Sequence, residues 1–520
     1  MFSKVYSATL TGIEAVIVQV EADVASGLPC LELVGYLACE VKEAGKRVKV
    51  ALKNSNYLLP PRRITINLSP ADLKKEGTAF DLPISVAVLA AAGFLSTKQL
   101  NNIMFAGELS LDGKLNAVAG ILPMICEAKK QEFTCCIVPK ANLAEGVFVT
   151  GIKVLGAENL VQVINYLLGK GCLTEKLEKK QEHVCLTEQK YIKPLDFCEV
   201  FGQKIAKRAI EIAVAGWHNL MLFGAPGSGK SMLAKRIPTI MPQLTIKQQL
   251  ELYKVYSVAG KLLKDPFCID QRPFCAPHHT ITQAAFTGGG KRPRPGEISL
   301  AVHGVLFLDE LPEFSRNVLE TLREPLEEKK ITITRTGGKN TYPADFLFVA
   351  AMNLCPCGYY PDRSRCHCTE SQIQKYLGKI SKALLDRIDL CTEVISNQYE
   401  ELQDEMKENE TSESIQKRIL MAHQIQRKRY QNLEILYNSQ LNSTQISQFC
   451  KLREPENKFL KQAFEKFRFS TRAYHRILKV ARTIADLENK EEIQKNHLAQ
   501  AISYRMTEQN SLEGEKEWIR

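Results

Sequence analysis

The feature that most constrains this chain is a glycine-rich run, FGAPGSGKSML, at residues 223–233. It follows the apolar stretch NLMLF and precedes the helical pattern MLAKRI, so we expect a strand, a tight loop and a helix in that order. Glycines let backbone N–H groups turn around phosphate oxygens, and the helix start adds the positive end of its dipole. Lys230 is then a point charge for the β and γ phosphates, and Ser231 offers a hydroxyl to Mg²⁺. The loop residues expected to hold a nucleoside triphosphate are Gly224, Gly227, Ser228, Gly229, Lys230 and Ser231.

Two further apolar runs end in polar residues suited to hydrolysis. The run VLFL is followed by Asp309, which would hold Mg²⁺ through water, and by Glu310, which would polarise an attacking water. A third run, FLFVAAM, is followed by Asn353, which would orient this water or sense the γ phosphate. An apolar run that ends in Asp-Glu is common by itself, and the phosphate loop upstream gives it weight. The set predicts ATP hydrolysis with ATP and Mg²⁺ as cofactors.

Two arginines complete the candidate set. Arg387 lies between acidic residues in LLDRIDL, and Arg472 lies near a helix start in STRAYHRILKVA, with Ser470 as its N-cap. An arginine that reaches the γ phosphate held by another subunit stabilises charge in the transition state. The alternative for either arginine taken alone is an ordinary surface ion pair.

The chain of 520 residues divides into four parts by pattern. Residues 1–167 alternate like strands around an apolar helix and predict an α/β domain with a hairpin at Asp112-Gly113. Residues 168–194 are polar and lysine-rich, and we expect a linker. Residues 195–395 carry short apolar runs suited to buried parallel strands, and residues 396–520 show charged helical spacing. The fold class is therefore α/β with a helical C-terminal domain.

Composition bounds the partners and the compartment. A net charge of +11 permits nucleic acid as a partner but does not require it. The 16 cysteines, in a chain without a signal peptide pattern, indicate reduced thiols or metal ligands and not a disulfide framework. The longest apolar stretch, Leu82–Leu95, is too short to span a bilayer. We expect a cytoplasmic protein with no membrane partner.

One group of cysteines has the spacing of a metal site. Cys355 and Cys357 form one pair, Cys366 and Cys368 form another, and a short loop joins the two pairs. Four thiolates this close favour a structural Zn²⁺ in tetrahedral coordination. His367 is a possible substitute ligand, and Cys-x-Cys is less diagnostic than Cys-x-x-Cys. The competing hypothesis is an insertion with coincidental thiols.

Five stretches of the chain resemble the magnesium-chelatase-like family of AAA+ ATPases. They are DFCEVFGQKIAKRAIEIAVAGWHNLMLFGAPGSGKSMLAKRIP, RPFCAPHHTITQAAFTGGGKRPRPGEISLAVHGVLFLDELPEF, CPCGYYPDRSRCHC, YLGKISKALLDRIDL and STRAYHRILKVARTIADL. The resemblance extends over nearly the whole chain. It implies an AAA+ P-loop α/β core and a helical lid, assembled as a ring with ATP at subunit interfaces.

The resemblance also implies roles for single residues. Asp309 and Glu310 would form the hydrolytic pair, and Asn353 would be the first sensor. Arg387 would be the arginine finger for a neighbouring subunit, and Arg472 the second sensor. The residues implied to lie near the adenine are Val200, Gly202 and Gln203. The chain departs from the family pattern at Ser231, where threonine is usual, and at Trp217 and Leu354, where a small residue and a proline are expected.

Members of this family from the bacterial competence group imply a more specific function. They look like homo-hexameric helicases that drive branch migration on single-stranded, forked or branched DNA, and recombination proteins are further expected partners. Two segments rich in glycine and cations are candidates for DNA-gripping loops. Their candidate DNA-binding residues are Lys291, Arg292 and Arg294 in the first and Arg335 and Lys339 in the second. The alternative is that both are ordinary exposed turns, and His278 and His279 are either substrate contacts or structural residues.

The first 167 residues resemble the Lon-protease-like (S5-like) domain, in KKEGTAFDLPISVAVLAAAGFL and GELSLDGKLNAVAGILPMICEA. A protease of that type needs a nucleophilic serine and a lysine base. Ala79 stands at the serine position and Leu122 at the lysine position, so we expect a non-proteolytic scaffold. Ser85 and Lys114 lie nearby and keep a displaced dyad open. Two alternatives to a DNA motor therefore remain: a chelatase-type ATPase that remodels a protein partner, and an ATP-dependent Lon-like protease.

Overall fold

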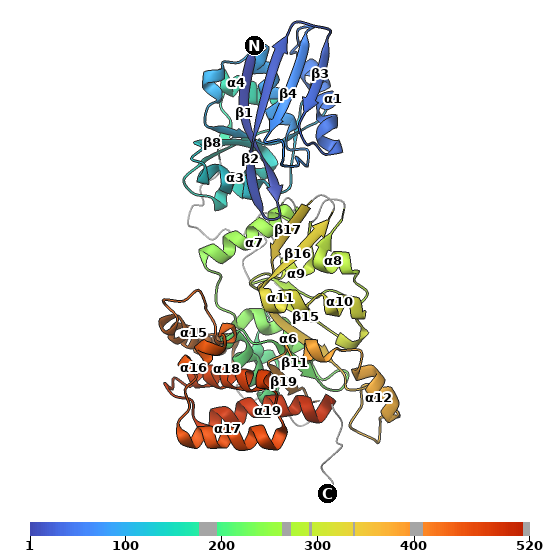
Figure 1. Cartoon of the computed structure of the whole chain (residues 1–520), viewed down its shortest axis with the longest axis vertical. Coiled ribbons are helices and arrows are strands. Elements are labelled where there is room, and N and C mark those ends of the chain that lie inside the picture. The colour runs from blue at the N-terminus through green and yellow to red at the C-terminus, as the bar shows by residue number, and fades with distance from the viewer. Residues whose placement is uncertain (176–194, 263–271, 291–293, 336–337, 396–408, 513–520) are drawn as a thin grey trace.

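The computed structural model describes residues 1–175, 195–262, 272–290, 294–335, 338–395 and 409–512. The molecule is elongated in Figure 1, with an N-terminal α/β domain at one end, a second α/β domain in the middle and a cluster of helices at the other end. This architecture confirms the predicted α/β class with a helical C-terminal region. Most of the predicted linker lies outside the described residues.

The N-terminal domain is built on one mixed sheet. Within the described residues this sheet has eight strands in the order β10-β9-β8-β5-β1-β2-β4-β3. The long antiparallel pair β1 and β2 forms its centre, with Phe2 opposite Asp23, and β5, β8 and β9 continue the sheet in parallel. The strands are β1 (Phe2–Thr11), β2 (Glu14–Ala25), β3 (Cys30–Val34), β4 (Arg63–Ser69), β5 (Ile103–Phe105), β8 (Cys135–Pro139), β9 (Lys153–Ala157) and β10 (Thr174–Glu175).

Helix α2 (Asp81–Ala91) is the core of this domain, and every one of its residues is buried. A helix that is largely apolar and buried all round must be covered on every side, and it packs against β1, β2 and α1 (Cys39–Asn54). Its first residue, Asp81, is fully buried and accepts two hydrogen bonds from Arg47, each 2.9 Å long. Desolvation raises the pKa of Asp81, and the Arg47 guanidinium opposes this. Helices α3 (Ile121–Lys130) and α4 (Leu160–Leu167) complete the domain.

Two details of this domain bear on the sequence predictions. The predicted hairpin at Asp112-Gly113 is present as β6 (Glu108–Leu109) and β7 (Leu115–Asn116). Two residues of the predicted linker, Thr174 and Glu175, form β10, which pairs with β9 at the edge of the sheet. A strand of two polar residues shows no alternation of apolar and polar side chains, so its sequence does not predict it. The strand is recognised only from its pairing with β9 in the structure.

The central domain holds a parallel sheet whose strands are buried on both faces. Its order within the described residues is β12-β15-β18-β11-β19. The strands are β11 (Leu220–Phe223), β12 (Phe274–Cys275), β15 (Val305–Leu308), β18 (Leu347–Met352) and β19 (Leu390–Glu393). Since all five run in the same direction, their carboxyl ends meet at one edge of the sheet. Helices α5 (Lys204–Gly216) and α6 (Lys230–Ile240) flank β11 in the chain.

Two hairpins project from this domain. β13 (Gly288–Gly289) pairs with β14 (Arg294–Pro295), and β16 (Lys330–Arg335) pairs with β17 (Gly338–Pro343). The short helices between the hairpins and the sheet are α8 (Gln283–Thr287), α9 (Glu297–Leu300), α10 (Arg316–Glu320) and α11 (Arg323–Glu328). In Figure 1 the β16–β17 hairpin lies on the side of the core that faces the N-terminal domain. A methyl group at Gly12, in the β1–β2 turn, would lie 2.8 Å from the carbonyl oxygen of Thr341, so this turn touches the hairpin.

Helix α7 (Ile246–Val258) joins the two α/β domains and packs on α3. Lys254 binds both carboxylate oxygens of Glu14, at 2.9 and 3.0 Å, and the ring of Tyr253 stacks on Phe148 at 3.8 Å. The hydroxyl of Ser257 donates to Glu145, whose side chain is buried and whose pKa is raised by desolvation. These contacts predict that the two domains move together at this interface.

The C-terminal helices form the lid. They are α15 (Ser412–Arg429), α16 (Ser443–Phe449), α17 (Glu454–Phe467), α18 (Thr471–Leu487) and α19 (Lys495–Leu512). The lid packs on α5, where Gln426 donates to the carbonyl of Ala215 at 3.0 Å and His218 bonds Thr483 at 2.8 Å. Trp217, one of the departures from the family pattern, stacks on Tyr437 of the lid at 5.0 Å. The tryptophan therefore joins core and lid.

Candidate functional site

The phosphate loop connects β11 to α6 at the carboxyl edge of the central sheet, in the strand–loop–helix order that the sequence predicts. The Lys230 ammonium donates to the carbonyls of Gly224 and Ala225, both at 2.8 Å, and to Asn353 Oδ1 at 3.1 Å. Burial lowers the pKa of Lys230, and the charges of Asp309 and Glu310 oppose this. A lysine held only by neutral oxygens in a partly buried site is suited to accept a strong anion.

The glycines of the loop are required by its backbone. Gly227 and Gly229 have φ of 76° and 96°, in the left-handed region that favours glycine. Gly224 meets a close neighbour, because a methyl group there would lie 2.3 Å from the carbonyl oxygen of Val394, just beyond β19. Ser228, between Gly227 and Gly229, is buried. The loop can therefore turn tightly only with glycine at these positions.

Ser231 and Asp309 meet directly. The Ser231 hydroxyl donates to Asp309 Oδ2 at 2.5 Å, and Asp309 Oδ1 accepts from the Glu310 backbone N–H at 3.0 Å. A hydroxyl and a carboxylate at this spacing are oxygen ligands of the kind that Mg²⁺ prefers. The two residues predicted to hold Mg²⁺ thus come from different elements, α6 and the end of β15, and lie side by side.

Glu310 has an unusual backbone and an ion-pair partner. Its φ is 53°, which is uncommon for a non-glycine residue and typical of functional sites. Its side chain is 58% exposed, and one carboxylate oxygen lies 3.7 Å from Nδ1 of His279. The ring of His279 also packs against that of His278, with centroids 4.0 Å apart and the two planes tilted by 35°. From the sequence, His279 was either a substrate contact or a structural residue. In the structure its side chain contacts Glu310, the predicted catalytic carboxylate.

The residues predicted to lie near the adenine occupy the turn before α5. Val200 is buried, Gly202 has φ of 62°, and Gln203 has φ of 53°. The side-chain amide of Gln203 donates to the carbonyl of Ile395. Since Val394 contacts Gly224, this turn and the phosphate loop converge on the end of β19.

The two predicted arginines differ in their surroundings. Arg387 is only 14% exposed, and its guanidinium lies 2.5 Å from Glu327 of the same chain and donates to the carbonyl of Ala383. Arg472 is exposed in the first turn of α18, where Ser470 is the N-cap, as predicted. A role of Arg387 in another subunit's site requires it to leave Glu327. The roles of both arginines remain predictions.

Sequence reasoning missed two lid arginines that hold the segment after Arg387. Arg476 and Arg505 both donate to the carbonyl of Ile388, at 2.9 and 2.8 Å. Arg476 also lies 3.5 Å from Asp389. The pKa of Asp389 is lowered below its usual range despite its burial, first by His218, whose Nδ1 lies 3.6 Å from the carboxylate, and then by Arg476. The spacing of Arg472 and Arg476 on one helix face was the available signal.

The four cysteines of the predicted metal site converge on one point. All four sulfurs lie within 4.8 Å of one another. Cys355 is 3.3 Å from Cys357 and 3.7 Å from Cys366, and Cys357 is 3.6 Å from Cys366, far longer than a disulfide bond. Four sulfurs about 2.3 Å from a central Zn²⁺ in a tetrahedron would lie about 3.8 Å apart, so the donor set fits zinc.

The electrostatics of this cluster also suit a cation. The backbone N–H of Tyr359 lowers the pKa of Cys357 to about 6, whereas desolvation raises that of Cys366 to about 12. A divalent cation at this point would bind the four sulfurs as thiolates and displace their protons. His367, the possible substitute ligand, is exposed and is not in the group of converging sulfurs.

Comparisons with known proteins show the family of this chain. The family descriptions that match are magnesium chelatase subunit ChlI at residues 196–402, subunit ChlI of Mg-chelatase at 20–142, and the subunit ChlI C-terminal part at 409–505. The competence protein ComM of Haemophilus influenzae is 42% identical over 96% of this chain and 97% of its own length. The chain belongs to the magnesium chelatase subunit ChlI family.

Two other relatives extend the picture. The YifB protein of Escherichia coli is 41% identical to this family member over 97% of both chains. Lon protease 2 of Bacillus subtilis is 24% identical over 41% of this chain and 43% of its own length. Within the described residues, no helix is long and apolar enough to cross a membrane.

The Lon-like resemblance does not bring a catalytic dyad together. Ala79 and Leu122, at the expected serine and lysine positions, are both buried. Ser85 is fully buried in α2, and its hydroxyl donates to the carbonyl of Asp81 at 2.8 Å. Lys114 is exposed and pairs with Asp112 at 3.1 Å. The displaced dyad therefore has no support, because its serine is bonded within a buried helix and its lysine is solvated.

The two predicted DNA-gripping loops lie beside one another. Arg294 is exposed on β14 and Lys339 on β17. A methyl group at Gly288 would lie 2.9 Å from Ile333 in the middle of β16, so the two hairpins touch there. The backbone of Arg335 lies in β16 opposite Gly338. Lys291 and Arg292 lie outside the described residues, so their predicted role stands without a structural account.

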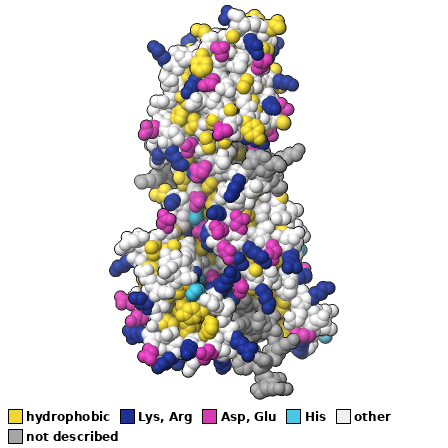
Figure 2. Space-filling view, in the orientation of Figure 1, with side chains coloured by type: hydrophobic (Ala, Val, Ile, Leu, Met, Phe, Trp, Pro, Cys, Tyr) yellow, Lys and Arg dark blue, Asp and Glu magenta, His cyan; other side chains and the backbone are white. Residues whose placement is uncertain are grey.

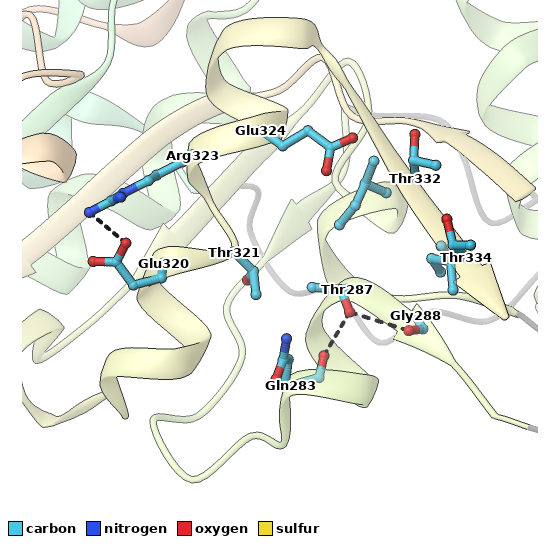
Figure 3. A pocket seen from close by; sticks show the side chains of 11 residues that line it. Gln283, Thr287, Gly288, Glu320, Thr321, Arg323, Glu324, Thr332 and Thr334 are labelled. Carbon is cyan, nitrogen blue, oxygen red and sulfur yellow. Dashed lines mark hydrogen bonds and ion pairs between the residues drawn. The ribbon is translucent and has the colours of Figure 1, made fainter. Parts of the chain in front are cut away.

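A polar pocket of about 400 Å³ lies beneath this contact (Figure 3). It is lined by α8, α10, α11 and β16, and Figure 3 shows Thr287 bonded within α8 and Arg323 paired with Glu320 across its rim. It contains none of the phosphate-loop residues. We interpret it as space between the hairpin bases and not as the nucleotide pocket.

Proposed function

We propose that this protein is an ATP-driven ring motor that acts on DNA, and that its activity is branch migration. The observation that carries the ATPase part is the convergence of the phosphate loop, Asp309, Glu310 and Asn353 at one sheet edge. Family membership supports the same chemistry, and the relative named competence protein supports a role with incoming DNA.

The chemistry follows from the positions of the residues. The loop N–H groups and Lys230 bind the β and γ phosphates, while Ser231 and Asp309 hold Mg²⁺, which neutralises charge on the phosphates when bound. Glu310 takes a proton from the attacking water, and Asn353 holds the water or the γ phosphate. Asn353 already lies 3.1 Å from the Lys230 ammonium, so both can reach the same phosphate.

The DNA part rests on the basic hairpins. Arg294 lies on β14, which leads to the Asp309 strand, and Lys339 lies on β17, which leads to the Asn353 strand. In Figure 2 basic side chains lie among acidic ones along this whole face, so the net charge of +11 does not by itself define a DNA surface. Contacts to a phosphate backbone through these hairpins would be independent of base sequence.

The assembly we propose is a homo-hexameric ring with ATP between subunits. Arg387 of one protomer would leave Glu327 and contact the γ phosphate bound to Lys230 of its neighbour, where its charge stabilises the transition state. We further propose a structural Zn²⁺ at Cys355, Cys357, Cys366 and Cys368, because their sulfurs fit tetrahedral coordination.

Strand exchange on a synthetic four-way DNA junction tests this function. With ATP and Mg²⁺, the purified protein should move the junction, and Lys230→Ala should abolish the movement. Lys235→Ala, an exposed lysine on the same helix α6, is the matched control and should behave like the unaltered chain. ATP hydrolysis that no DNA stimulates, together with no binding to forks or junctions, would contradict the DNA motor.

The hairpins need their own test. Lys339→Ala combined with Arg294→Ala should weaken DNA binding and lower its salt dependence while leaving DNA-free hydrolysis intact. Lys330→Ala, at the base of the same hairpin and paired with Glu328, is the control. Equal loss in the control and the test variant would remove the hairpins from the proposal.

Capture of a protein client by an ATP-trapped Glu310→Gln variant, without DNA, would support the protein-remodelling alternative.

A further inference from the structure

The four-cysteine loop is joined directly to the nucleotide site. It begins two residues after Asn353, whose side chain lies 3.1 Å from the Lys230 ammonium. Between the end of β18 at Met352 and the start of α12 (Glu370–Leu377), residues 353–369 contain no helix or strand. Loops of this length without secondary structure are uncommon in compact domains, so other contacts must order this one.

Sulfur contacts supply part of that order. Cys355 is fully buried, and its sulfur accepts hydrogen bonds from the backbone N–H groups of Gly358 at 3.2 Å and Tyr360 at 3.4 Å. Gly358 also donates to the carbonyl of Cys355 at 3.0 Å. The turn at Gly358 is therefore built around the first ligand of the cluster.

The same turn presses on the phosphate loop. Gly358 has φ of 87°, and a methyl group there would lie 2.4 and 2.5 Å from Cγ and Cδ of Pro226. The next atom such a methyl group would meet is the Asn353 amide nitrogen, at 3.6 Å. Pro226 lies within the phosphate loop, between Gly224 and Gly227. Only a glycine allows the cysteine loop to approach the phosphate loop this closely.

We propose that the metal-bound cysteine cluster positions the nucleotide site, so that ATP affinity depends on its occupancy. The inference rests on the zinc site proposed above and goes beyond it. A bound metal fixes four points of a loop that has no secondary structure, and this holds Gly358 against Pro226 and Asn353 beside Lys230. Loss of the metal, or oxidation of the thiols, frees the loop, and the phosphate loop must then be ordered by ATP itself.

None of the cysteines is a phosphate-loop residue, so removal of the metal breaks no contact with ATP. The expected loss of ATP affinity comes from misplacement of the phosphate loop. Small shifts of catalytic or binding groups change rates and affinities by on the order of ten- to a hundred-fold. We expect about a ten-fold rise in the Kd for ATP when the metal is removed, which is about 1.4 kcal/mol.

The test compares zinc content with ATP affinity in the full chain. Zinc per chain is measured by elemental analysis, and the Kd is measured with a fluorescent ATP analogue before chelation, after chelation and after zinc is restored. Cys357→Ser and Cys368→Ser should lose zinc and bind ATP about ten-fold more weakly. Cys39→Ser, at an exposed cysteine of the N-terminal domain, is the control and should change neither.

Gly358→Ala separates the two halves of the proposal, because it keeps all four ligands but crowds Pro226. It should retain zinc and still lose ATP affinity. Gly93→Ala is matched to it, with a similar φ of 89° and no neighbour within 4 Å, and should retain both zinc and affinity.

The outcomes are distinct. Loss of zinc with unchanged ATP affinity would overturn the coupling and leave the zinc site standing. A chain purified without any metal, whose ATP affinity ignores chelator, would overturn both the zinc site and the inference. Restored affinity on return of zinc, after chelation alone, would support the coupling without any substitution that affects folding.

Discussion

The Ser231 hydroxyl lies 2.5 Å from Asp309 Oδ2, although the two residues stand 78 positions apart in the chain. The contact joins the first turn of α6 to the end of β15. It places one hydroxyl and one carboxylate where Mg²⁺ can bind both, and it makes Ser231 the residue whose chemistry can be tested with the smallest change.

Ser231→Ala should lower kcat for ATP hydrolysis by on the order of a hundred-fold, because it removes a magnesium ligand at the transferring phosphate. Ser231→Thr keeps the hydroxyl and is the matched control, which should stay within a few-fold of the unaltered chain. Steady-state hydrolysis across a magnesium titration is the measurement. Equal rates for the alanine and threonine variants would show that the hydroxyl is not a ligand.

His279→Ala should raise hydrolysis in the absence of DNA. The imidazole lies 3.7 Å from the Glu310 carboxylate, and we expect this contact to compete with the attacking water for the carboxylate. An exposed pair of this kind is worth about 1 kcal/mol or less, so the expected rise is up to about five-fold. His278→Ala removes the neighbouring ring without touching Glu310 and serves as control. A fall in the rate would mean that His279 supports catalysis directly.

Arg47→Met should destabilise the N-terminal domain by about 3–5 kcal/mol, because it leaves the fully buried Asp81 without its partner. The double variant Arg47→Met with Asp81→Leu should recover most of this stability. Arg63→Met, which breaks an exposed pair with Glu32, should change the melting temperature little. Calorimetry of the three variants measures these differences, and an equal loss at Arg47 and Arg63 would contradict the assignment.

The lid should lose stability in mild acid through His423. Desolvation lowers the pKa of this buried histidine to about 4, against about 6.5 in an unfolded chain. The folded lid binds a proton at His423 more weakly than the unfolded chain does. The stability that the neutral histidine provides is therefore complete above about pH 6.5 and is lost as the pH falls toward 4. The expected change is about 3 kcal/mol.

His423→Leu should flatten this pH dependence of unfolding, whereas His475→Leu, at a less buried histidine on α18, should leave it in place. Chemical unfolding monitored at several pH values from 4 to 7.5 or so gives the comparison. An unchanged slope in His423→Leu would assign the acid sensitivity to other groups.

The sequence predicted the parts of the nucleotide site that sit at strand ends. β15 and β18 are short apolar runs followed by Asp309 and Asn353, and β11 is a short apolar run followed by the glycine-rich loop. Parallel strands bring their carboxyl ends together by geometry alone. The pairs that it could not predict join side chains far apart in the chain with no periodic signature: Arg387 with Glu327, His279 with Glu310, and Gly358 with Pro226.

The N-terminal domain shows the same division. Its hairpin at Asp112-Gly113 was predictable from turn chemistry, and its buried α2 from a long run of mostly apolar residues. The contact of Ser257 with Glu145 was not predictable from the sequence. Both residues are polar, so a sequence pattern predicts them at the surface, and it is the domain interface that buries them.

The central claim is that Lys230 of one protomer and Arg387 of its neighbour act on the same ATP, and mixing two inactive variants tests it most directly. Lys230→Ala and Arg387→Ala should each lose junction-stimulated hydrolysis when assayed alone. Mixed in equal amounts, they should recover activity, since about a quarter of the interfaces in random rings contain both intact residues. If rings form in the mixture and no activity returns, the two residues do not share a nucleotide and the ring motor is wrong.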